Sequence, residues 1–376
     1  MRVLHINAGN VYGGVETFLV TLARNAHLCP GMKSSFAICF PGRFREELVA
    51  AGAPVHSLGA VRTRRFWSVW QARRRLRKLL GDFDVILCHM PWNHAVFGTA
   101  VKRAGKPLVF WLHNPAIGSG WLEWWARRTT PDLVIANSRF TAASLPLLFA
   151  QVPHRIIHYP VASREVVAAD ALAVRQEFGA SRDTVVIVQV SRMEAWKGHR
   201  LHLQALAELK DLPGWMCWMV GGAQMDGEPE YLNGLKQQAV QFGIADRVRF
   251  LGQRADVPQI LAASDIFCQP NASPEPFGIV FIEALQTGLP VVATRSGGAV
   301  EILQDERCLV EPGDHRALAE RLRHLVKSPE ERRIMGRRGP ERARSLCDPG
   351  TQMDELHRTL SDLARGAVSM PTLSNH

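Results

Sequence analysis

The chain has 376 residues, 47% of them hydrophobic, which is enough for two globular domains with full cores. Its formal net charge of +10 favours an anionic partner, which could be nucleic acid, acidic lipid or a phosphorylated substrate. No apolar run reaches about 18 residues and the first residues do not resemble a signal peptide, so we expect a cytoplasmic protein.

Short β-branched runs alternate with helical patterns along nearly the whole chain, which predicts parallel sheets built from βαβ units. The first half contains seven such runs, at residues 2–8, 34–40, 53–58, 84–90, 107–113, 133–137 and 155–160. The second half contains six, at residues 184–191, 215–222, 248–252, 266–271, 290–294 and 308–312. We therefore expect an α/β protein of two Rossmann-like, doubly wound domains, with the ligand in a central cleft between them.

Domain boundaries follow from the polar stretch after Tyr159 and Pro160, where a new series of strands begins. This predicts one domain at residues 1–163, a second at 164–350, and a C-terminal segment at 351–376 whose last residues are frayed.

The seven cysteines are scattered, without a CxxC pair or a Cys/His cluster, and are expected to be reduced thiols.

A glycine pair precedes the first predicted helix, where NAGNVYGGVETF runs from a strand through Gly13 and Gly14 to a helix expected near Val15. Such glycines fit an ordinary turn as well as a loop that approaches a ligand. Glu16 could hold a hydroxyl group of a ligand or cap the helix.

The most basic stretch of the chain is VRTRRFWSVWQARRRLRKLLGDFD, which follows a helical pattern. One interpretation is a solvated helix face whose Leu76, Leu79 and Leu80 pack inward. The other is a surface for anionic lipid, because Trp67 and Trp70 lie among arginines, and WLEWWARR could continue that surface or line an acceptor pocket. No nucleic-acid-binding module is recognisable, so nucleic acid is not an expected partner.

Two cations follow the first strand of the second half, where VQVSRMEAWKGHR places Arg192 and Lys197 five residues apart before a helix near Gly198. Cations at a strand's carboxyl end suit a diphosphate, although a basic protein also carries such pairs on its surface. His113, at the carboxyl end of PLVFWLH, is a lone histidine of the kind that is usually structural.

Two acids flank a helix start in EPFGIVFIEALQTGLPVVAT, with Glu275 in the loop and Glu283 inside an apolar helix expected near Phe277 or Gly278. Taken alone, Glu275 would be an ordinary acidic residue of a loop and Glu283 a solvated residue on the outer face of the helix. Gly278 allows close backbone approach, however, and a helix start offers N–H groups to a phosphate. Together these features suit a sugar nucleotide, with one acid on the sugar and one on the ribose.

The R-x4-K pattern followed by E-x7-E, with EPFG before the helix and TGLPVVAT after it, resembles the retaining glycosyltransferases of GT-B fold in family 4, or glycosyl transferases group 1. The resemblance covers roughly residues 1–345. It implies that Glu275 contacts the transferred sugar, that Glu283 binds the ribose, and that Arg192 and Lys197 stabilise the leaving diphosphate.

The resemblance also implies roles for other residues. Donor binding would involve Gly14, Phe277, Gly278, Ile279, Val280 and Glu283; the acceptor loop would hold Gly13 and Glu16; and His113 would orient the sugar through a ring nitrogen. Residues 1–163 would serve the acceptor and 164–350 the donor, and a helix at 351–365 would return to the first domain.

The implied partners are a nucleotide-sugar donor, preferably a UDP-sugar, and a glycan, lipid-linked or small-molecule acceptor, with the anionic inner face of the cell membrane as a candidate third partner. The resemblance implies that no cofactor and no metal is needed. Two rival functions are a nucleotide-sugar epimerase of GT-B fold and a non-catalytic sugar-nucleotide or glycan-binding relative.

Overall fold

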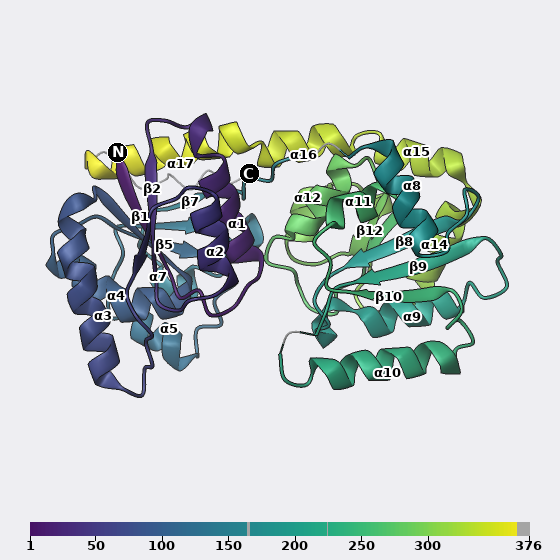
Figure 1. The fold of residues 1–376 in the computed structure, drawn as a ribbon, viewed down its shortest axis with the longest axis horizontal. Helices are drawn as coiled ribbons and strands as arrows, with labels where there is room; N and C mark the ends of the chain where they lie inside the picture. Colours follow the sequence, from purple (N-terminus) through teal and green to yellow (C-terminus); the bar gives the residue numbers. More distant parts are fainter. Residues whose placement is uncertain (164–165, 224, 367–376) are drawn as a thin grey trace. The chain divides into compact units, whose positions relative to one another are not determined.

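The computed structural model describes residues 1–163, 166–223 and 225–366 (Figure 1). The chain forms two compact units: Met1–Ala162 together with the C-terminal segment from Cys347, and Ser163–Leu346. The first boundary lies one residue before the predicted one, and the return to the first unit lies four residues before it. The predicted frayed end falls on residues 367–376, outside the described residues.

The first unit contains a seven-stranded parallel sheet in the order β3-β2-β1-β4-β5-β6-β7. Its strands are β1 (Arg2–Asn7), β2 (Lys33–Ile38), β3 (Val55–Ser57), β4 (Val85–His89), β5 (Leu108–Leu112), β6 (Leu133–Ala136) and β7 (His154–Ile156). Chain order reverses between β1 and β4, which makes this pair the switch point where ligands of such sheets bind.

Eight α-helices and two 3₁₀ turns belong to the described part of this unit: α1 (Gly14–Arg24), η1 (Ala26–Leu28), α2 (Arg43–Ala50), α3 (Phe66–Leu79), η2 (Leu80–Asp82), α4 (Met90–Arg103), α5 (Trp121–Ala126), α6 (Arg139–Ala142), α7 (Pro146–Phe149) and α17 (Pro349–Ala364). Helices α3, α4 and α5 pack in a row on one face of the sheet (Figure 1). Alternate strand residues such as Leu4 and Ile6 contribute to the core beneath them. The intervening residues, including His5, face the opposite side, where Phe18 of α1 packs.

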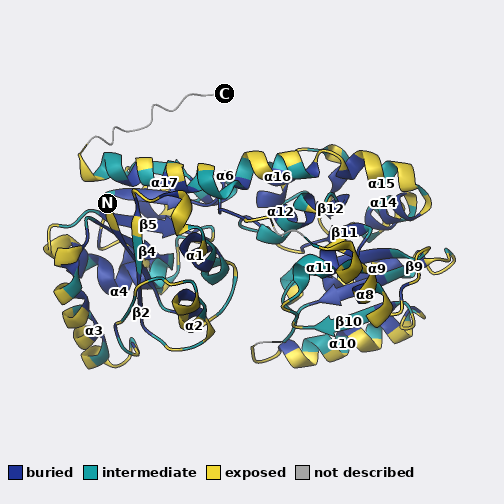
Figure 2. Cartoon of the chain, turned by 45° about the horizontal axis from the view of Figure 1, so that its top comes forward, coloured by how far each residue is buried: buried dark blue, intermediate teal, exposed yellow. Residues whose placement is uncertain are grey.

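The second unit contains a six-stranded parallel sheet in the order β10-β9-β8-β11-β12-β13. Its strands are β8 (Val185–Val190), β9 (Trp215–Val220), β10 (Val248–Gly252), β11 (Ile266–Gln269), β12 (Val291–Thr294) and β13 (Leu309–Val310). Chain order reverses between β8 and β11. The strands of both sheets are largely dark blue in Figure 2, as expected of parallel strands covered on both faces.

The helices of the second unit form two layers. One layer includes α9 (His199–Ala207), α10 (Glu228–Gln241) and α14 (His315–Lys327), and the other includes α8 (Ala168–Glu177), α11 (Val257–Ala262), α12 (Ile279–Gln286) and α13 (Gly298–Leu303). The remaining elements are α15 (Pro329–Gly336), α16 (Gly339–Cys347), η3 (Ala195–Lys197) and η4 (Glu306–Cys308).

Helix α17 returns the chain to the first unit. Asp348 caps it by accepting from the Thr351 N–H at 2.8 Å, and Pro349 occupies its first turn, where a missing N–H costs nothing. Its side chains Met353, Leu356 and Leu360 are buried, and the helix contacts η1. The two connections to the second unit are joined by the Val161 N–H, which donates to the Cys347 carbonyl at 2.9 Å.

All seven cysteines are free and buried. Burial raises the pKa of the Cys39 thiol to about 12, so this group is neutral at physiological pH. Within the described residues, no helix combines the length and the apolar character needed to cross a bilayer.

Candidate functional site

In the second unit, the predicted residues Arg192, Lys197 and Glu275 lie on loops that follow β8 and β11. These strands are the pair between which chain order reverses, and the loop after the neighbouring β12 holds Gly297 and Gly298. Because the carboxyl ends of parallel strands meet at one edge of the sheet, the fold places these three loops beside one another.

The Glu275 carboxylate is the centre of this site. Its Oε2 accepts from the Lys197 Nζ at 2.6 Å and from the Asn271 Nδ2 at 2.9 Å. The side chains of Lys197 and Glu275 are only 13% and 12% exposed, so this ion pair is better shielded from water than the surface pairs of this protein. The Lys197 ammonium also lies 3.8 Å from the centroid of the Trp196 ring.

Backbone contacts fix the loops to one another. The Ala272 N–H donates to the Trp196 carbonyl at 2.7 Å, which joins the loops after β8 and β11. The Gly298 N–H donates to the Glu275 carbonyl at 2.7 Å, which joins the loops after β11 and β12. Gly198, with a φ of +74°, packs so tightly that a Cβ there would lie 1.7 Å from the Pro270 carbonyl oxygen. Only glycine fits this contact.

Helix α12 begins immediately after Glu275. Gly278, at a φ of +100°, is its N-cap, so the helix starts at Ile279, one residue later than the latest predicted start. Phe277 is buried, whereas Ile279 and Val280 are half-buried in the first turn, whose N–H groups lack intrahelical acceptors. Glu283 follows on the same helix and is half-buried rather than solvated.

Arg192 forms its own ion pair beside this cluster. Its guanidinium contacts the Glu194 carboxylate through two nitrogens, one of them Nε at 3.2 Å from Oε2. The structure therefore gives the two predicted cations separate acidic partners, Glu194 for Arg192 and Glu275 for Lys197.

Buried amides support the loops from below. Gln189 of β8 donates through Nε2 to the Lys197 carbonyl at 2.8 Å and accepts at Oε1 from His202 Nδ1 at 2.8 Å. Gln269 of β11 donates through Nε2 to the Asn271 Oδ1 at 3.2 Å. Burial lowers the pKa of His202 to about 3, so its ring is neutral and can share hydrogen bonds with Gln189 without placing a charge in the core.

In the first unit, the glycine-pair loop after β1 forms a helix cap. Gly13 is the N-cap of α1, which starts at Gly14 rather than Val15. The Glu16 Oε2 accepts from the Gly13 N–H at 3.0 Å, and its Oε1 accepts from the Asn7 Nδ2 at 3.2 Å. Of the two predicted roles for Glu16, the structure shows helix capping.

A chain of buried rings crosses the same sheet. His5 Nδ1 lies 3.0 Å from His89 Nε2, and His89 Nδ1 lies 2.9 Å from His113 Nε2. His113 Nδ1 then lies 2.6 Å from the Tyr159 hydroxyl, which also accepts from the Asn137 Nδ2 at 3.0 Å. Burial lowers the pKa of His5 and of His113 to about 3, and it lowers that of His89 as well, so the three rings are neutral.

These contacts give His113 two protein partners, while its predicted role of orienting the sugar stays a prediction. Its side chain is almost fully buried and both of its ring nitrogens have protein partners, so a hydrogen bond from either nitrogen to a sugar hydroxyl would have to replace one of them. In this structure His113 positions Tyr159 and His89.

Several residues of these networks were not predicted from the sequence. Asn271 ends the run IFCQPN, and a polar side chain at a strand's carboxyl end was an available signal. His5 and His89 each interrupt an apolar strand, as His113 does, but their contact depends on strand register, which a single sequence does not reveal.

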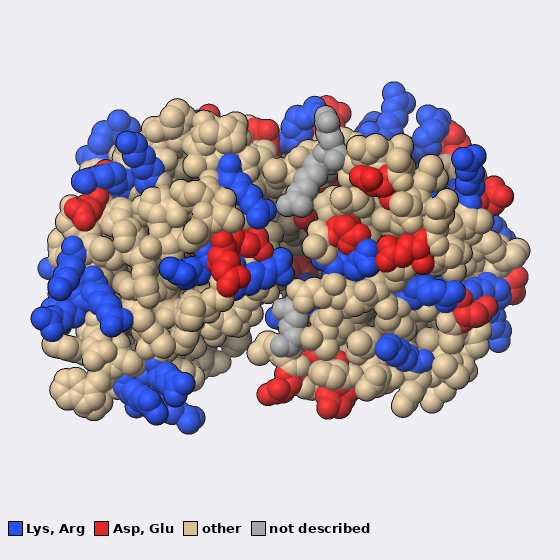
Figure 3. Space-filling model, in the orientation of Figure 1, with Lys and Arg blue, Asp and Glu red and all other residues tan. Residues whose placement is uncertain are grey.

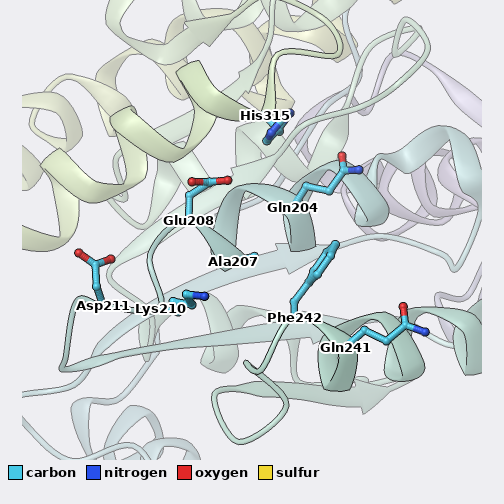
Figure 4. A pocket seen from close by; sticks show the side chains of 8 residues that line it. All are labelled: Gln204, Ala207, Glu208, Lys210, Asp211, Gln241, Phe242 and His315. Carbon is cyan, nitrogen blue, oxygen red and sulfur yellow. The ribbon is translucent and has the colours of Figure 1, made fainter.

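Other features of the described residues lie apart from these networks. No group of three or more His, Cys, Asp or Glu side chains in the described ranges could hold a metal ion. A pocket of about 550 Å³ lies between the ends of α9 and α10 and is lined by Gln204, Ala207, Glu208, Lys210, Asp211, Gln241, Phe242 and His315 (Figure 4). Because α9 starts at the carboxyl edge of the sheet, the pocket at its end belongs to the opposite edge.

Comparison with known proteins identifies the two halves separately. The family described as Glycosyl transferases group 1 matches residues 171–342, and Glycosyltransferase Family 4 matches residues 12–161. The lipopolysaccharide core biosynthesis glycosyltransferase LpsE of Rhizobium meliloti (strain 1021) is 30% identical over 56% of this chain and 58% of its own. The D-inositol 3-phosphate glycosyltransferase of Segniliparus rotundus is 31% identical over 67% of this chain and 62% of its own. The chain thus spans less than two thirds of either relative.

Solved structures match over a longer range. Anabaena Alr3699/HepE in complex with UDP superposes with a TM-score of 0.85 at 26% identity, covering 96% of this chain and all of that one. The complex of the same protein with UDP-glucose gives a TM-score of 0.84. WaaG, a glycosyltransferase of lipopolysaccharide biosynthesis, has a TM-score of 0.72 at 16% identity, a likeness of fold.

Proposed function

Because the chain belongs to the glycosyl transferases group 1 family and has the two Rossmann-like domains of the GT-B fold, we propose that it is a retaining glycosyltransferase that uses a nucleotide-diphosphate sugar. The acceptor in this proposal is a hydroxyl group of a glycan, a lipid-linked molecule or a small molecule. The observation that carries the proposal is the cluster of Lys197, Glu275 and Asn271 at the switch point of the second sheet.

The donor diphosphate would lie between Lys197 and the start of α12. The Lys197 ammonium has three N–H groups, so it can keep its bond to Glu275 and still donate to phosphate oxygens. The first-turn N–H groups of Ile279 and Val280, with Gly278 allowing close approach, would bind the same oxygens. Arg192 would add a second cation by donating N–H groups beyond those used by Glu194.

In the proposed reaction, the bond between the sugar's anomeric carbon and the diphosphate breaks while the acceptor oxygen bonds to that carbon on the same face. The acceptor proton passes to the leaving phosphate oxygen. Lys197 and Arg192 stabilise the growing negative charge on the diphosphate, so that no metal is needed for this step. Glu275 accepts a hydroxyl of the transferred sugar, and Glu283 accepts the ribose hydroxyls.

A UDP-sugar is the preferred donor because the Anabaena structure at 26% identity was obtained with UDP and with UDP-glucose. A relative at 29% identity is named a GDP-mannose-dependent mannosyltransferase, so guanine nucleotides belong in the same test. In a thermal-shift screen of UDP, GDP, ADP and their sugar conjugates, we expect a rise in Tm with uridine compounds.

Two variants test the assigned roles. Glu283→Ala should weaken donor binding by about 1 to 3 kcal/mol through lost ribose hydrogen bonds. Lys197→Ala should mainly lower kcat, by about 100-fold, because it removes a donor to the leaving group. Lys236→Ala on the exposed side of α10 is the control and should match the wild type. Equal donor binding and turnover in all three variants would refute the assignment.

Product analysis after incubation with the stabilising nucleotide sugar separates the rival functions. An epimerase would convert the nucleotide sugar into an isomer without any acceptor, whereas a transferase alone would show at most slow hydrolysis. A binding relative would be stabilised by nucleotide and give neither product.

A further inference from the structure

Helix α3 leaves three large aromatic side chains in solvent. Phe66, Trp67 and Trp70 are 69%, 62% and 46% exposed. Their rings contact one another, with centroids 4.7 Å apart for Phe66 and Trp67 and 6.2 Å apart for Trp67 and Trp70. The opposite side of the helix supplies Val69, Ala72 and Leu76 to the core, so the fold does not need the aromatic cluster for its own packing. Exposed apolar clusters of this kind mark interaction surfaces.

Basic residues surround this cluster, and no acidic residue occurs between Glu47 and Asp82. Six exposed side chains besides Arg75 carry the charge: Arg62, Arg64, Arg65, Arg74, Arg77 and Lys78. None of the six forms an ion pair within the described part of the chain. Figure 3 shows blue side chains gathered over the region of α3 in the first unit. The field of this helix is therefore positive and not neutralised by the protein itself.

Two further arginines of α3 have a structural role and do not simply extend into solvent. Arg73 Nε donates to the Val96 carbonyl at 2.6 Å, and Arg75 Nη1 donates to the Leu58 carbonyl at 2.9 Å. These bonds hold the helix against its neighbours. Arg74, in contrast, stays outside and lies 5.6 Å from the centroid of the Trp70 ring.

A second aromatic group lies on α5 and the loop before it. Trp121 and Trp124 are 62% and 54% exposed, and Ile117 is 76% exposed. The only acid of this helix, Glu123, is buried and accepts from the backbone N–H groups of Ile117 and Gly118 at 2.9 and 2.6 Å. Arg128 lies 3.8 Å from the centroid of the Trp124 ring. The outer surface of α5 thus has the same chemistry as that of α3.

The two groups belong to one side of the first unit. Helices α3, α4 and α5 are successive neighbours on the same face of the sheet, which places the axes of α3 and α5 about 20 Å apart at ordinary packing distances. Both α3 and α5 begin after the carboxyl ends of their preceding strands, at the edge of the sheet where the loop of Gly13 also lies. Phe66, Trp67, Trp121 and Trp124 occupy these starting turns, and Trp70 follows in the second turn of α3.

We propose that this surface, defined by Phe66, Trp67, Trp70, Trp121, Trp124 and the basic residues of α3, docks the protein on a bilayer rich in anionic lipid. Tryptophan rings and arginine side chains are the groups that favour the interface between headgroups and acyl chains, while unpaired positive charge attracts anionic headgroups. Docking would hold the acceptor-side edge of the first unit against the membrane. The inference concerns the first unit alone and does not depend on the identity of the donor.

The test is co-sedimentation of the full chain with sucrose-loaded vesicles. We expect binding to vesicles of phosphatidylcholine with 30% phosphatidylglycerol, and at least tenfold weaker binding to phosphatidylcholine alone. The variants Trp67→Ser with Trp70→Ser, and Arg74→Ser with Arg77→Ser, should each reduce binding to the anionic vesicles at least tenfold. Lys236→Ser with Val240→Ser, on the exposed side of α10 in the second unit, is the matched control and should bind like the wild type.

Two outcomes would overturn the inference directly: the wild type does not bind anionic vesicles, or the α3 variants bind them as well as the wild type. A third would point to nucleic acid as the partner: the α3 variants lose binding to single-stranded RNA while their vesicle binding is unchanged. The stabilisation by UDP separates this result from the proposed function. If the protein is stabilised by UDP but does not bind vesicles, only the docking inference is refuted. If it binds vesicles through α3 but binds no nucleotide, only the proposed function is refuted.

Discussion

Asn271 is a neutral hydrogen-bond partner of Glu275, whose other partner in this cluster is the charged Lys197. It is almost fully buried; its side-chain amide donates to the Glu275 carboxylate at 2.9 Å and accepts from Gln269 at 3.2 Å, and its backbone carbonyl accepts from the Thr294 hydroxyl at 2.9 Å. A side-chain amide with one bond through its nitrogen and one through its oxygen has a defined orientation, which fixes its donor toward Glu275. We infer that Asn271 orients the Glu275 carboxylate, which in the proposed function contacts the transferred sugar.

The variant Asn271→Ala tests this positioning role. The Glu275 carboxylate keeps Lys197 but loses its neutral donor, so we expect kcat to fall about tenfold, corresponding to one hydrogen bond to a charged group. The KM for the donor should change by less, because the ribose and diphosphate contacts are intact. Steady-state kinetics of the variant beside Asn233→Ala, an exposed asparagine of α10, provides the measurement. A raised KM at unchanged kcat would instead make Asn271 a simple binding residue.

At the scale of elements, the site depends on how closely the loops after β8 and β11 approach each other. Gly198 allows this approach, because a Cβ at its position would overlap the Pro270 carbonyl. Gly214 has nearly the same backbone conformation, with a φ of +77°, but open space around it. The two glycines therefore separate the cost of a left-handed φ from the cost of a backbone clash.

We expect Gly214→Ala to destabilise the protein by about 1 to 2 kcal/mol, the cost of a left-handed conformation in an L-residue. Gly198→Ala should cost more, and it should also weaken UDP binding about tenfold because the loop that carries Lys197 must move. Chemical denaturation and nucleotide titration of both variants measure the two effects. If Gly198→Ala lost no more nucleotide affinity than Gly214→Ala, the loops would not depend on this contact.

Elements and sites differ in how far the sequence predicts them. All thirteen strands of the described residues lie within one residue of the predicted runs or inside them, because buried parallel strands are marked by local apolar runs. Several predicted runs extended past the carboxyl end of the strand. In β11, for example, the run included Pro270 and Asn271, which belong to the following loop and not to the hydrogen-bonded strand. Arg192, Lys197, Glu275 and Glu283 could be predicted as site residues because their spacing is local, and their roles stay predictions.

The ring chain of His5, His89 and His113 could not be predicted in the same way. Its members are separated by 84 and 24 residues, and they meet only because β1, β4 and β5 are neighbours with a particular register. A histidine in an apolar strand indicates a buried imidazole, but not its partner. Side-chain geometry therefore adds to His113 a membership of this ring chain that the sequence did not predict.

At the scale of the whole molecule, the buried histidines make stability depend on pH. An unfolded imidazole has a pKa of about 6.5, whereas burial holds His5 and His113 at about 3. Between these values the unfolded chain binds more protons than the folded one, so the free energy of unfolding decreases as the pH falls. The stabilisation is fully present above about pH 6.5 and is lost as the pH approaches 3.

Each such histidine should cost about 2 kcal/mol between pH 7 and pH 5. Denaturation of the wild type at several pH values measures the total slope. The variant His5→Phe, whose ring can keep the stack on Phe36, should have a smaller slope, and His27→Gln on the surface should keep that of the wild type. Identical slopes for all three proteins would show that His5 is not titrated on unfolding.

The first unit is built from both ends of the chain, and this order has a consequence for synthesis. When residues 1–162 leave the ribosome, the helix that covers their η1 region with Met353, Leu356 and Leu360 has not yet been translated. The second unit, a continuous segment, can fold while the first still exposes apolar surface. The domain made first is thus the last to be finished. A nascent chain that stops before Pro349 would contain a folded second unit and a first unit whose core is still exposed, so loss of this short C-terminal stretch should cause aggregation rather than a mild defect.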